Sequence, residues 1–153
     1  MKMAEKINNL LWPNDFSKCS ERALPHVRAL AKQYDAVVHV LYVAEDLAHH
    51  EPWYGEFDPS HIGRIVSWQL KKAQEYQQVF CGRHLDECAA YKTHIEVGNP
   101  AKIILKFIND KDIDMVVMCR RGKSEEFNIG GVAQKIVTNS PVPVLITPGS
   151  KEN

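Results

Sequence analysis

The chain has 153 residues, of which 44% are hydrophobic and 25% are charged. This length is enough for one well-filled hydrophobic core and too short for two ordinary domains, so we expect a single domain over residues 1–153. Nineteen basic and nineteen acidic side chains cancel. The balance excludes a general electrostatic attraction to nucleic acid or to an anionic membrane surface, and any affinity for an anion must come from a local site.

The compartment and the state of the cysteines follow from the same composition. No apolar run approaches the roughly 18 residues of a membrane span, and residues 1–9 lack the apolar core of a signal peptide, which predicts a cytoplasmic protein. The cysteines are scattered rather than arranged in CxxC pairs: Cys19, Cys81, Cys88 and Cys119. We therefore expect four reduced thiols, with neither a zinc site nor a disulfide framework.

The start of the chain predicts a strand followed by a helix. Residues 7–12 are short and mostly apolar, as in a strand, and a turn-forming Pro-Asn-Asp triplet stops them. Ser17 or Ser20 can cap the helix that follows, in which apolar residues recur at helical spacing. Pro25 is tolerated in a first turn, or it marks a slightly later start of the helix.

The middle of the chain holds two strands separated by a loop and a long helix. Residues 37–43 are nearly continuous in branched and apolar side chains, which predicts a strand covered on both faces. A polar, aromatic insertion follows at about residues 44–60, and it covers a site or is mobile. Helical spacing then extends from residue 62 to about residue 88, and the alternation over residues 91–97 predicts an edge strand.

The last third repeats the alternation of helix and strand. Pro100 lies where it can begin a helix with a buried apolar stripe. An apolar strand is predicted at residues 115–118, a final helix at about 132–139, and a last strand at 144–147. Five strands with helices between them predict an α/β fold, with a parallel sheet and helices on both of its faces.

In this architecture ligands bind beyond the carboxyl ends of the strands. Three separated segments fall at such ends: the triplet at residues 13–15, Val43, and the loop after Met118. That loop is edged by glycines at 122, 130 and 131 and leads into a helix, whose first amides can bind phosphate. Glu125 and Glu126 in the same loop would repel phosphate, so the loop both suggests a nucleotide site and weakens it.

The order of these pieces resembles the universal stress protein family over nearly the whole chain. The opening strand and acidic turn, Leu11-Trp12-Pro13-Asn14-Asp15-Phe16-Ser17, are similar to those of the family. So are Glu96-Val97-Gly98-Asn99-Pro100-Ala101 and Ile113-Asp114-Met115-Val116-Val117-Met118. The closing helix and strand, with Val132-Ala133-Gln134-Lys135-Ile136-Val137 and Ser140-Pro141-Val142-Pro143-Val144-Leu145, complete the resemblance.

The resemblance implies a doubly wound five-stranded parallel sheet with strand order 3-2-1-4-5, a Rossmann-like fold of the adenine nucleotide alpha hydrolase type. It also implies a homodimer, often formed through the last strands. Members of the family either bind ATP or do not, and those that bind it carry Gly, two residues, Gly, nine residues, Gly, then Ser or Thr.

This sequence departs from that motif three times. Cys119 takes the first glycine position, and Gly122 matches the second. Only seven residues separate Gly122 from Gly130, and Gly131 stands where a hydroxyl would contact phosphate. Losing that hydroxyl costs on the order of 1 kcal/mol, roughly a fivefold change in affinity, so the shorter loop matters more.

Other parts of the family's nucleotide site are retained. Asp15 matches an acidic residue that can accept hydrogen bonds from adenine or ribose, and Val43 matches a residue that lines the adenine pocket. Arg120, Arg121 and Lys123 can contact phosphate oxygens. The candidate site comprises Pro13, Asn14, Asp15, Val43, Met118, Cys119, Arg121, Gly122, Gly130, Gly131 and Val132.

Simpler interpretations stand beside these. Asp15 can merely cap the first helix, and the glycines can be ordinary turn residues. Cys119 can be redox-sensitive because basic residues nearby favour a thiolate, but a small buried side chain at a strand end is the favoured role. His49, His50 and His61 with Glu51 and Asp58 lack a metal-binding spacing, so we expect no metal beyond Mg²⁺ accompanying a nucleotide.

Three functions compete on this basis. The leading one is a cytoplasmic, dimeric stress-response domain that binds ATP or a related adenine nucleotide. The second is a protein-interaction module without a nucleotide, which uses its insertion and its dimer edge to hold an unidentified protein partner. The third, an ATP-hydrolysing enzyme, is disfavoured because no nucleophile, base and orienting residue can be assembled from motif spacing.

Overall fold

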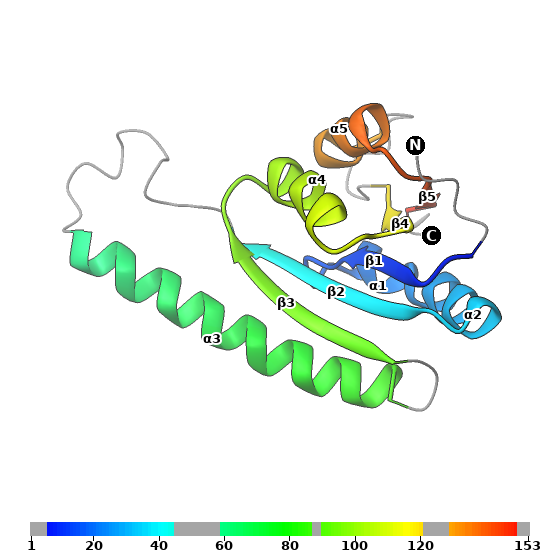
Figure 1. The fold of residues 1–153 in the computed structure, drawn as a ribbon. Helices are drawn as coiled ribbons and strands as arrows, with labels where there is room; N and C mark the ends of the chain where they lie inside the picture. Colours follow the sequence, from blue (N-terminus) through cyan, green and yellow to red (C-terminus); the bar gives the residue numbers. More distant parts are fainter. Residues whose placement is uncertain (1–5, 45–58, 87–89, 121–128, 150–153) are drawn as a thin grey trace.

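The computed structural model describes residues 6–44, 59–86, 90–120 and 129–149. Five parallel strands form one sheet in the order β3-β2-β1-β4-β5, which confirms the expected doubly wound topology (Figure 1). The strands are β1 (Asn9–Pro13), β2 (Val37–Ala44), β3 (Tyr91–Val97), β4 (Met115–Cys119) and β5 (Val144–Thr147). β3 lies at an edge and β2 in the interior, as their patterns predict.

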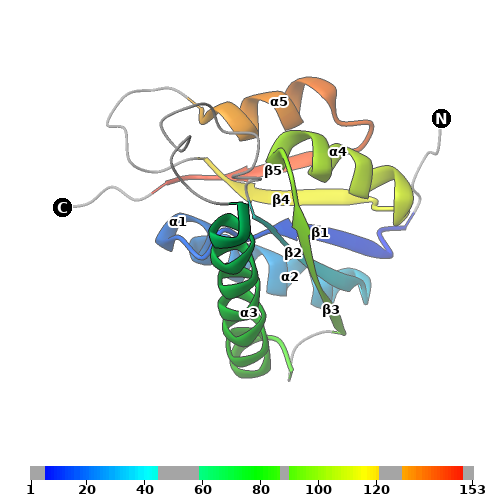
Figure 2. The same ribbon diagram turned by 90° about the vertical axis from the view of Figure 1, so that its left-hand side faces the viewer.

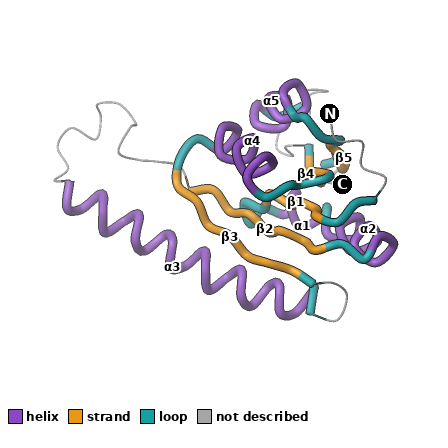
Figure 3. Tube along the Cα trace, in the orientation of Figure 1, coloured by secondary structure: helices purple, strands orange, loops and turns teal. Residues whose placement is uncertain are grey.

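Helices cover both faces of the sheet and alternate with the strands along the chain (Figures 2 and 3). α1, α2 and α3 lie on one face, and α4 and α5 on the other. Their bounds are α1 (Lys18–Arg22), α2 (Leu24–Tyr34), α3 (Pro59–His84), α4 (Pro100–Asp110) and α5 (Gly131–Asn139). None of the helices in the described segments is long and apolar enough to cross a membrane.

The helix expected after β1 is divided into two. The side chain of Ser17 caps α1 by accepting a hydrogen bond from the amide of Ser20, and Pro25 lies in the first turn of α2. Proline has no amide hydrogen, and its ring clashes with the carbonyl four residues earlier, so one continuous helix cannot pass through Pro25. The later of the two starts that the sequence allowed is therefore the one observed for α2.

The boundaries of the insertion also differ from the expectation. Ala44 is the last residue of β2, and residues 59 and 60 already belong to α3. Residues 45–58 lie outside the described residues, and with them most of the aromatic and histidine side chains of the insertion. α3 ends at His84, about four residues before the predicted end, and Cys88 is also outside the described residues.

Two hydrophobic clusters form the core, one on each face of the sheet. Leu10, Trp12 and Val40 belong to the cluster beneath α1, α2 and α3, and all three are fully buried. Leu11 and Val116 belong to the cluster beneath α4 and α5. Successive strand residues point to opposite faces, so Leu10 and Trp12 pack into one cluster and Leu11 packs into the other.

A pair of imidazole side chains joins β2 and β3 at one side of the sheet. His39 on β2 is 4% exposed, and its Nδ1 lies 3.0 Å from Nε2 of His94 on β3. The Nδ2 of Asn9 faces the carbonyl oxygen of Asp112 at 3.4 Å, which leaves its Oδ1 to accept from His39 Nε2 at 3.1 Å. His39 thus donates through Nε2 and accepts at Nδ1 from His94, an arrangement that requires the His39 ring to be neutral.

Candidate functional site

The carboxyl end of β1 is a tightly bonded turn. Asn14 is 2% exposed, and its amide donates to the carbonyl oxygen of Leu41 at 2.9 Å, which ties the turn to β2. Its side-chain oxygen accepts from the amide of Phe16 and from the hydroxyl of Ser20, both at 2.8 Å. Asn14 is therefore a structural residue that holds the turn, while Asp15 is carried at its exposed tip.

Asp15 shares in this turn through one of its two oxygens. Its Oδ1 accepts from the amide of Ser17 at 3.0 Å and lies 2.9 Å from the hydroxyl of Ser20, whose one hydrogen it shares with Oδ1 of Asn14. Burial alone would raise the pKa of Asp15, but the hydrogen bonds from Ser17 and Ser20 outweigh it and hold the pKa below its usual value. Asp15 is therefore an ionised acceptor. Ser17 and Ser20 contact its Oδ1 and do not hydrogen-bond to its Oδ2.

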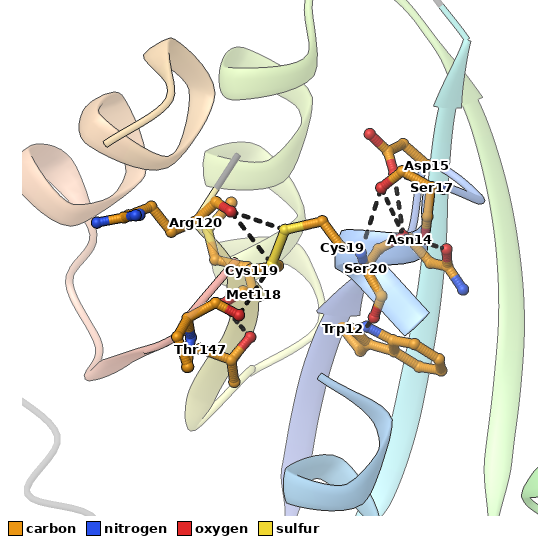
Figure 4. The surroundings of a disulfide bond; sticks show 11 residues. Trp12, Asn14, Asp15, Ser17, Cys19, Ser20, Met118, Cys119, Arg120 and Thr147 are labelled. Atoms are coloured by element: carbon orange, nitrogen blue, oxygen red, sulfur yellow. Dashed lines mark hydrogen bonds between the residues drawn. A yellow bond between two sulfur atoms is a disulfide. The ribbon is translucent and has the colours of Figure 1, made fainter. Parts of the chain in front are cut away.

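The prediction of four reduced thiols is wrong for two of the cysteines. Cys19 on α1 and Cys119 at the end of β4 form a disulfide, with Cα atoms 5.7 Å apart (Figure 4). The two residues are 100 positions apart in the sequence, so no local motif predicts the pair. They meet because the fold places α1 beside β4. Cys81 on α3 is free and buried.

Val43 and Met118 lie on the opposite face of the sheet from the α1 segment. Met118 is 6% exposed within the cluster beneath α4 and α5, and Val43 packs against the same cluster. Both side chains are therefore part of the core and also stand at the carboxyl ends of their strands. This position allows them to form the apolar floor of a crevice.

The start of α5 presents backbone donors. Its cap residue, Gly130, provides no side-chain hydrogen bond, and the first amide bonded within the helix is that of Gln134, which donates to Gly130 at 2.9 Å. The amides of the first turn, which include Gly131 and Val132, have no partner within the helix. A side chain built at Gly131 would meet nothing within 4 Å, so this end of α5 is open.

Arg120 links the end of β4 to this region. Its amide donates to the carbonyl oxygen of Thr147 at 2.9 Å, and its side chain points away from the disulfide (Figure 4). Its Nε is buried and has no hydrogen-bond partner among the described residues. The predicted site residues Arg121 and Gly122 lie outside the described residues.

One cavity of the described part lies beside the predicted site rather than within it. An open groove of about 550 Å³ runs along α3 and is lined mainly by aromatic and aliphatic side chains. Phe16 and Tyr42 form its wall toward the sheet, and their rings stack with centroids 4.7 Å apart. The sequence did not predict this groove, because no motif marks Phe16, the residue between Asp15 and Ser17. The backbone φ of Phe16 is 65°, in the left-handed region.

Metal ligands are not assembled in the part of the chain that the structure describes. No group of three or more His, Cys, Asp or Glu side chains there is placed to hold a metal ion. His49, His50, Glu51 and Asp58 lie outside the described residues, and His61 is in α3.

The strand order and the helices on both faces of the sheet define a doubly wound α/β domain. The model of the universal stress protein family matches residues 6–148, and the chain belongs to that family. It is 29% identical over 144 residues to universal stress protein MJ0531 of Methanocaldococcus jannaschii, a match that covers 92% of this chain and 81% of the relative.

Solved structures share the fold. The structure of hypothetical protein MJ0577 matches with a TM-score of 0.81 at 24% identity and covers 95% of this chain and 99% of that chain. A universal stress protein from Archaeoglobus fulgidus in complex with dAMP matches with a TM-score of 0.65 at 16% identity, covering 92% and 96%.

Proposed function

We propose that this chain binds an adenine nucleotide in the crevice at the carboxyl ends of β1, β2 and β4, and that it acts as a regulatory stress-response domain rather than as an enzyme. The observation that carries the proposal is the amino end of α5, whose first amides have no partner within the helix, together with the buried Nε of Arg120, which has no partner among the described residues. Family membership and the dAMP complex of a protein with the same fold support it.

The described residues supply complementary parts of such a site. The amides of Gly131 and Val132 and the guanidinium of Arg120 are donors for phosphate oxygens. Asp15 supplies an ionised acceptor at the far side of the crevice, and Val43 and Met118 supply apolar surface. The hydrogen-bond donors for phosphate thus lie toward α5, and the ionised acceptor lies toward α1.

A regulatory role fits the chemistry of these groups better than turnover does. Among the described residues of the crevice, none pairs a nucleophile with a base and an orienting group. A bound nucleotide would instead shift an equilibrium between two conformations, by an amount set by its different affinity for each. Mg²⁺ would accompany the phosphates rather than occupy a protein site.

Two substitutions at opposite ends of the crevice test nucleotide binding. We expect Gly131→Ser to bind ATP about fivefold more tightly, because the hydroxyl adds a hydrogen bond to phosphate in open space. We expect Asp15→Asn to bind about tenfold more weakly, because it keeps Oδ1 for the turn and replaces the second acceptor with a donor. Isothermal titration calorimetry with ATP, ADP and AMP measures both changes.

The matched control is Asp110→Asn, which removes an exposed carboxylate at the end of α4, just before β4 begins and therefore at the opposite end of the strands from the crevice. Its affinity should equal that of the wild type. The absence of heat with all three nucleotides at about 100 μM wild-type protein would contradict the proposed function.

A second candidate function, an interaction module, is favoured by an apolar stripe on α3. Ile65, Trp68 and Val79 are 46%, 62% and 63% exposed. With Lys72 and Glu75 they follow the alternating three- and four-residue spacing of a coiled-coil seam. The stripe is self-complementary, because an antiparallel second copy can set Lys72 against its Glu75 and Trp68 against its Val79.

Measuring self-association distinguishes an interface on this stripe of α3 from the dimer interface expected at β5. We propose the β5 dimer as the leading form, because β5 is an edge strand and Leu145 is 37% exposed. Sedimentation velocity on Leu145→Asp should then show at least about a tenfold weaker dimer, while Trp68→Glu leaves association unchanged. The reverse pattern would assign the interface to α3, and a wild type that remains monomeric at about 100 μM would contradict both surfaces.

A further inference from the structure

We propose that the Cys19–Cys119 pair is a reversible thiol–disulfide site that controls the nucleotide crevice: the disulfide restricts entry of the nucleotide, and the dithiol form admits it. This inference rests on the proposed function, because it assigns the regulation of the same crevice. Its reaction partner is a dithiol reductant in one direction and a disulfide oxidant in the other.

The bond joins two segments that border the proposed crevice, α1 and the carboxyl end of β4. Cys19 lies on α1, two residues after the Ser17 cap that bonds Asp15, and Cys119 is the last residue of β4. Ligands of doubly wound sheets bind at these carboxyl ends. A covalent link with a Cα separation of 5.7 Å holds the α1 segment against the end of β4 and prevents the two from separating.

The surroundings of the two sulfur atoms suit the reduced state as well as the oxidised one. The carbonyl oxygen of Arg120 lies 2.7 Å from Sγ of Cys19 and 3.2 Å from Sγ of Cys119. The carbonyl oxygen of Pro148 lies 3.8 Å from Sγ of Cys119. These oxygens can accept hydrogen bonds from thiols once the disulfide is reduced, so reduction leaves no buried donor without an acceptor.

The pair is also within reach of a reactant. Both cysteines are only partly buried, whereas Cys81 on α3 is fully buried and its pKa is raised to about 11 by burial. Exchange requires a thiolate and access to the sulfur, so Cys81 is inert under conditions in which the partly buried pair reacts. Cys81 therefore serves as an internal control.

The exchange balances in atoms and electrons. A thiolate of the dithiol attacks one sulfur of the Cys19–Cys119 bond and forms a mixed disulfide, and the other cysteine leaves as a thiolate and takes up a proton. The second thiol of the reductant then attacks the mixed disulfide and releases the remaining cysteine. Two electrons pass to the protein, which gains two thiols, while the dithiol becomes a disulfide.

Calorimetry with ATP on the full chain in both redox states tests the inference. The oxidised protein, with its thiols counted by titration, should bind ATP at least about tenfold more weakly than protein reduced with dithiothreitol. Cys19→Ser cannot form the bond and should bind like the reduced wild type in both conditions. Cys81→Ser should keep the full difference between the two states.

The outcomes are distinguishable. Equal affinity in both redox states, with nucleotide bound in each, overturns the redox control and leaves the proposed function intact. Absence of binding in both states overturns the proposed function and the control with it. A disulfide that persists in a large excess of dithiothreitol under native conditions overturns reversibility, and circular dichroism of Cys19→Ser shows whether that variant is folded.

Discussion

Replacement of Trp12 by alanine is expected to lower the free energy of unfolding by about 3–5 kcal/mol, the range for a large aromatic side chain removed from a packed core. Trp12 is fully buried on β1, where its ring lies 5.9 Å from that of Phe80 on α3. Its Nε1 donates to the carbonyl oxygen of Ser20 at 3.1 Å, which ties α1 to the sheet. Urea unfolding followed by far-ultraviolet circular dichroism measures the change.

Two further tryptophan variants separate the contributions of volume and hydrogen bonding. Trp12→Phe should cost less, about 1–2 kcal/mol, because the Ser20 carbonyl also accepts from the amide of Ala23 at 3.2 Å and is not left unpaired. Trp68→Ala removes a side chain that is 62% exposed and should change stability by no more than about 0.5 kcal/mol. Equal losses for Trp12→Ala and Trp68→Ala would refute this description of the core.

Mild acid is expected to destabilise the protein through the imidazole pair. Burial, followed by the nearby charges of His94, Lys92 and Lys111, lowers the pKa of His39 to about 4. In the unfolded chain the pKa of His39 is about 6.5. Between about pH 6.5 and pH 4 the unfolded state therefore binds a proton that the folded state does not bind. Stability is therefore full above about pH 6.5 and falls as the pH drops toward 4.

The size of this effect follows from linkage at about 1.4 kcal/mol per pKa unit. His39 alone should remove about 1 kcal/mol between about pH 7.5 and pH 5.5, and up to about 3 kcal/mol by pH 4. Burial also lowers the pKa of His94, which adds to the loss. A proton on Nδ1 of His39 would set two N–H groups against each other across the 3.0 Å contact with Nε2 of His94.

Urea unfolding over this pH range tests the pair. His39→Gln removes the titrating group and should flatten the dependence, whatever its effect on stability at pH 7.5. His26→Gln, at an exposed position on α2, should leave the dependence as in the wild type. A wild-type stability that is constant from about pH 7.5 to pH 5.5 would disprove the assignment of a neutral His39 ring.

Local patterns predicted the regular elements well. The spacing of apolar residues located β3 and β5 at their observed bounds and placed the start of α4 at Pro100, where Asn99 caps the helix by accepting from the amide of Lys102. β1 begins two residues later and ends one residue later than predicted; at its start the amides of Asn8 and Asn9 donate to the carboxylate of Asp114 at 2.8 and 2.9 Å. That carboxylate lies more than one hundred positions away in the sequence.

The candidate site was predicted less completely. The sequence indicated Asp15, Gly131 and the end of β4 through glycine, acidic and strand patterns, which are local signals, and their part in a binding site stays a prediction. It assigned Asn14 to the crevice, whereas the structure shows a buried residue that holds the turn. It also predicted separate thiols at Cys19 and Cys119, since no spacing rule reports contacts between residues on different crossovers.

The sequence by itself determined which segments become strands and helices and in what order, and through that order it determined the family and the parallel sheet. Only the tertiary structure decided which distant side chains meet: Cys19 with Cys119, His39 with His94, and Trp12 with Phe80. The reason is physical. Periodicity and capping act over a few neighbouring residues, whereas these contacts depend on how the crossovers stack helices on the sheet and bring strand ends together.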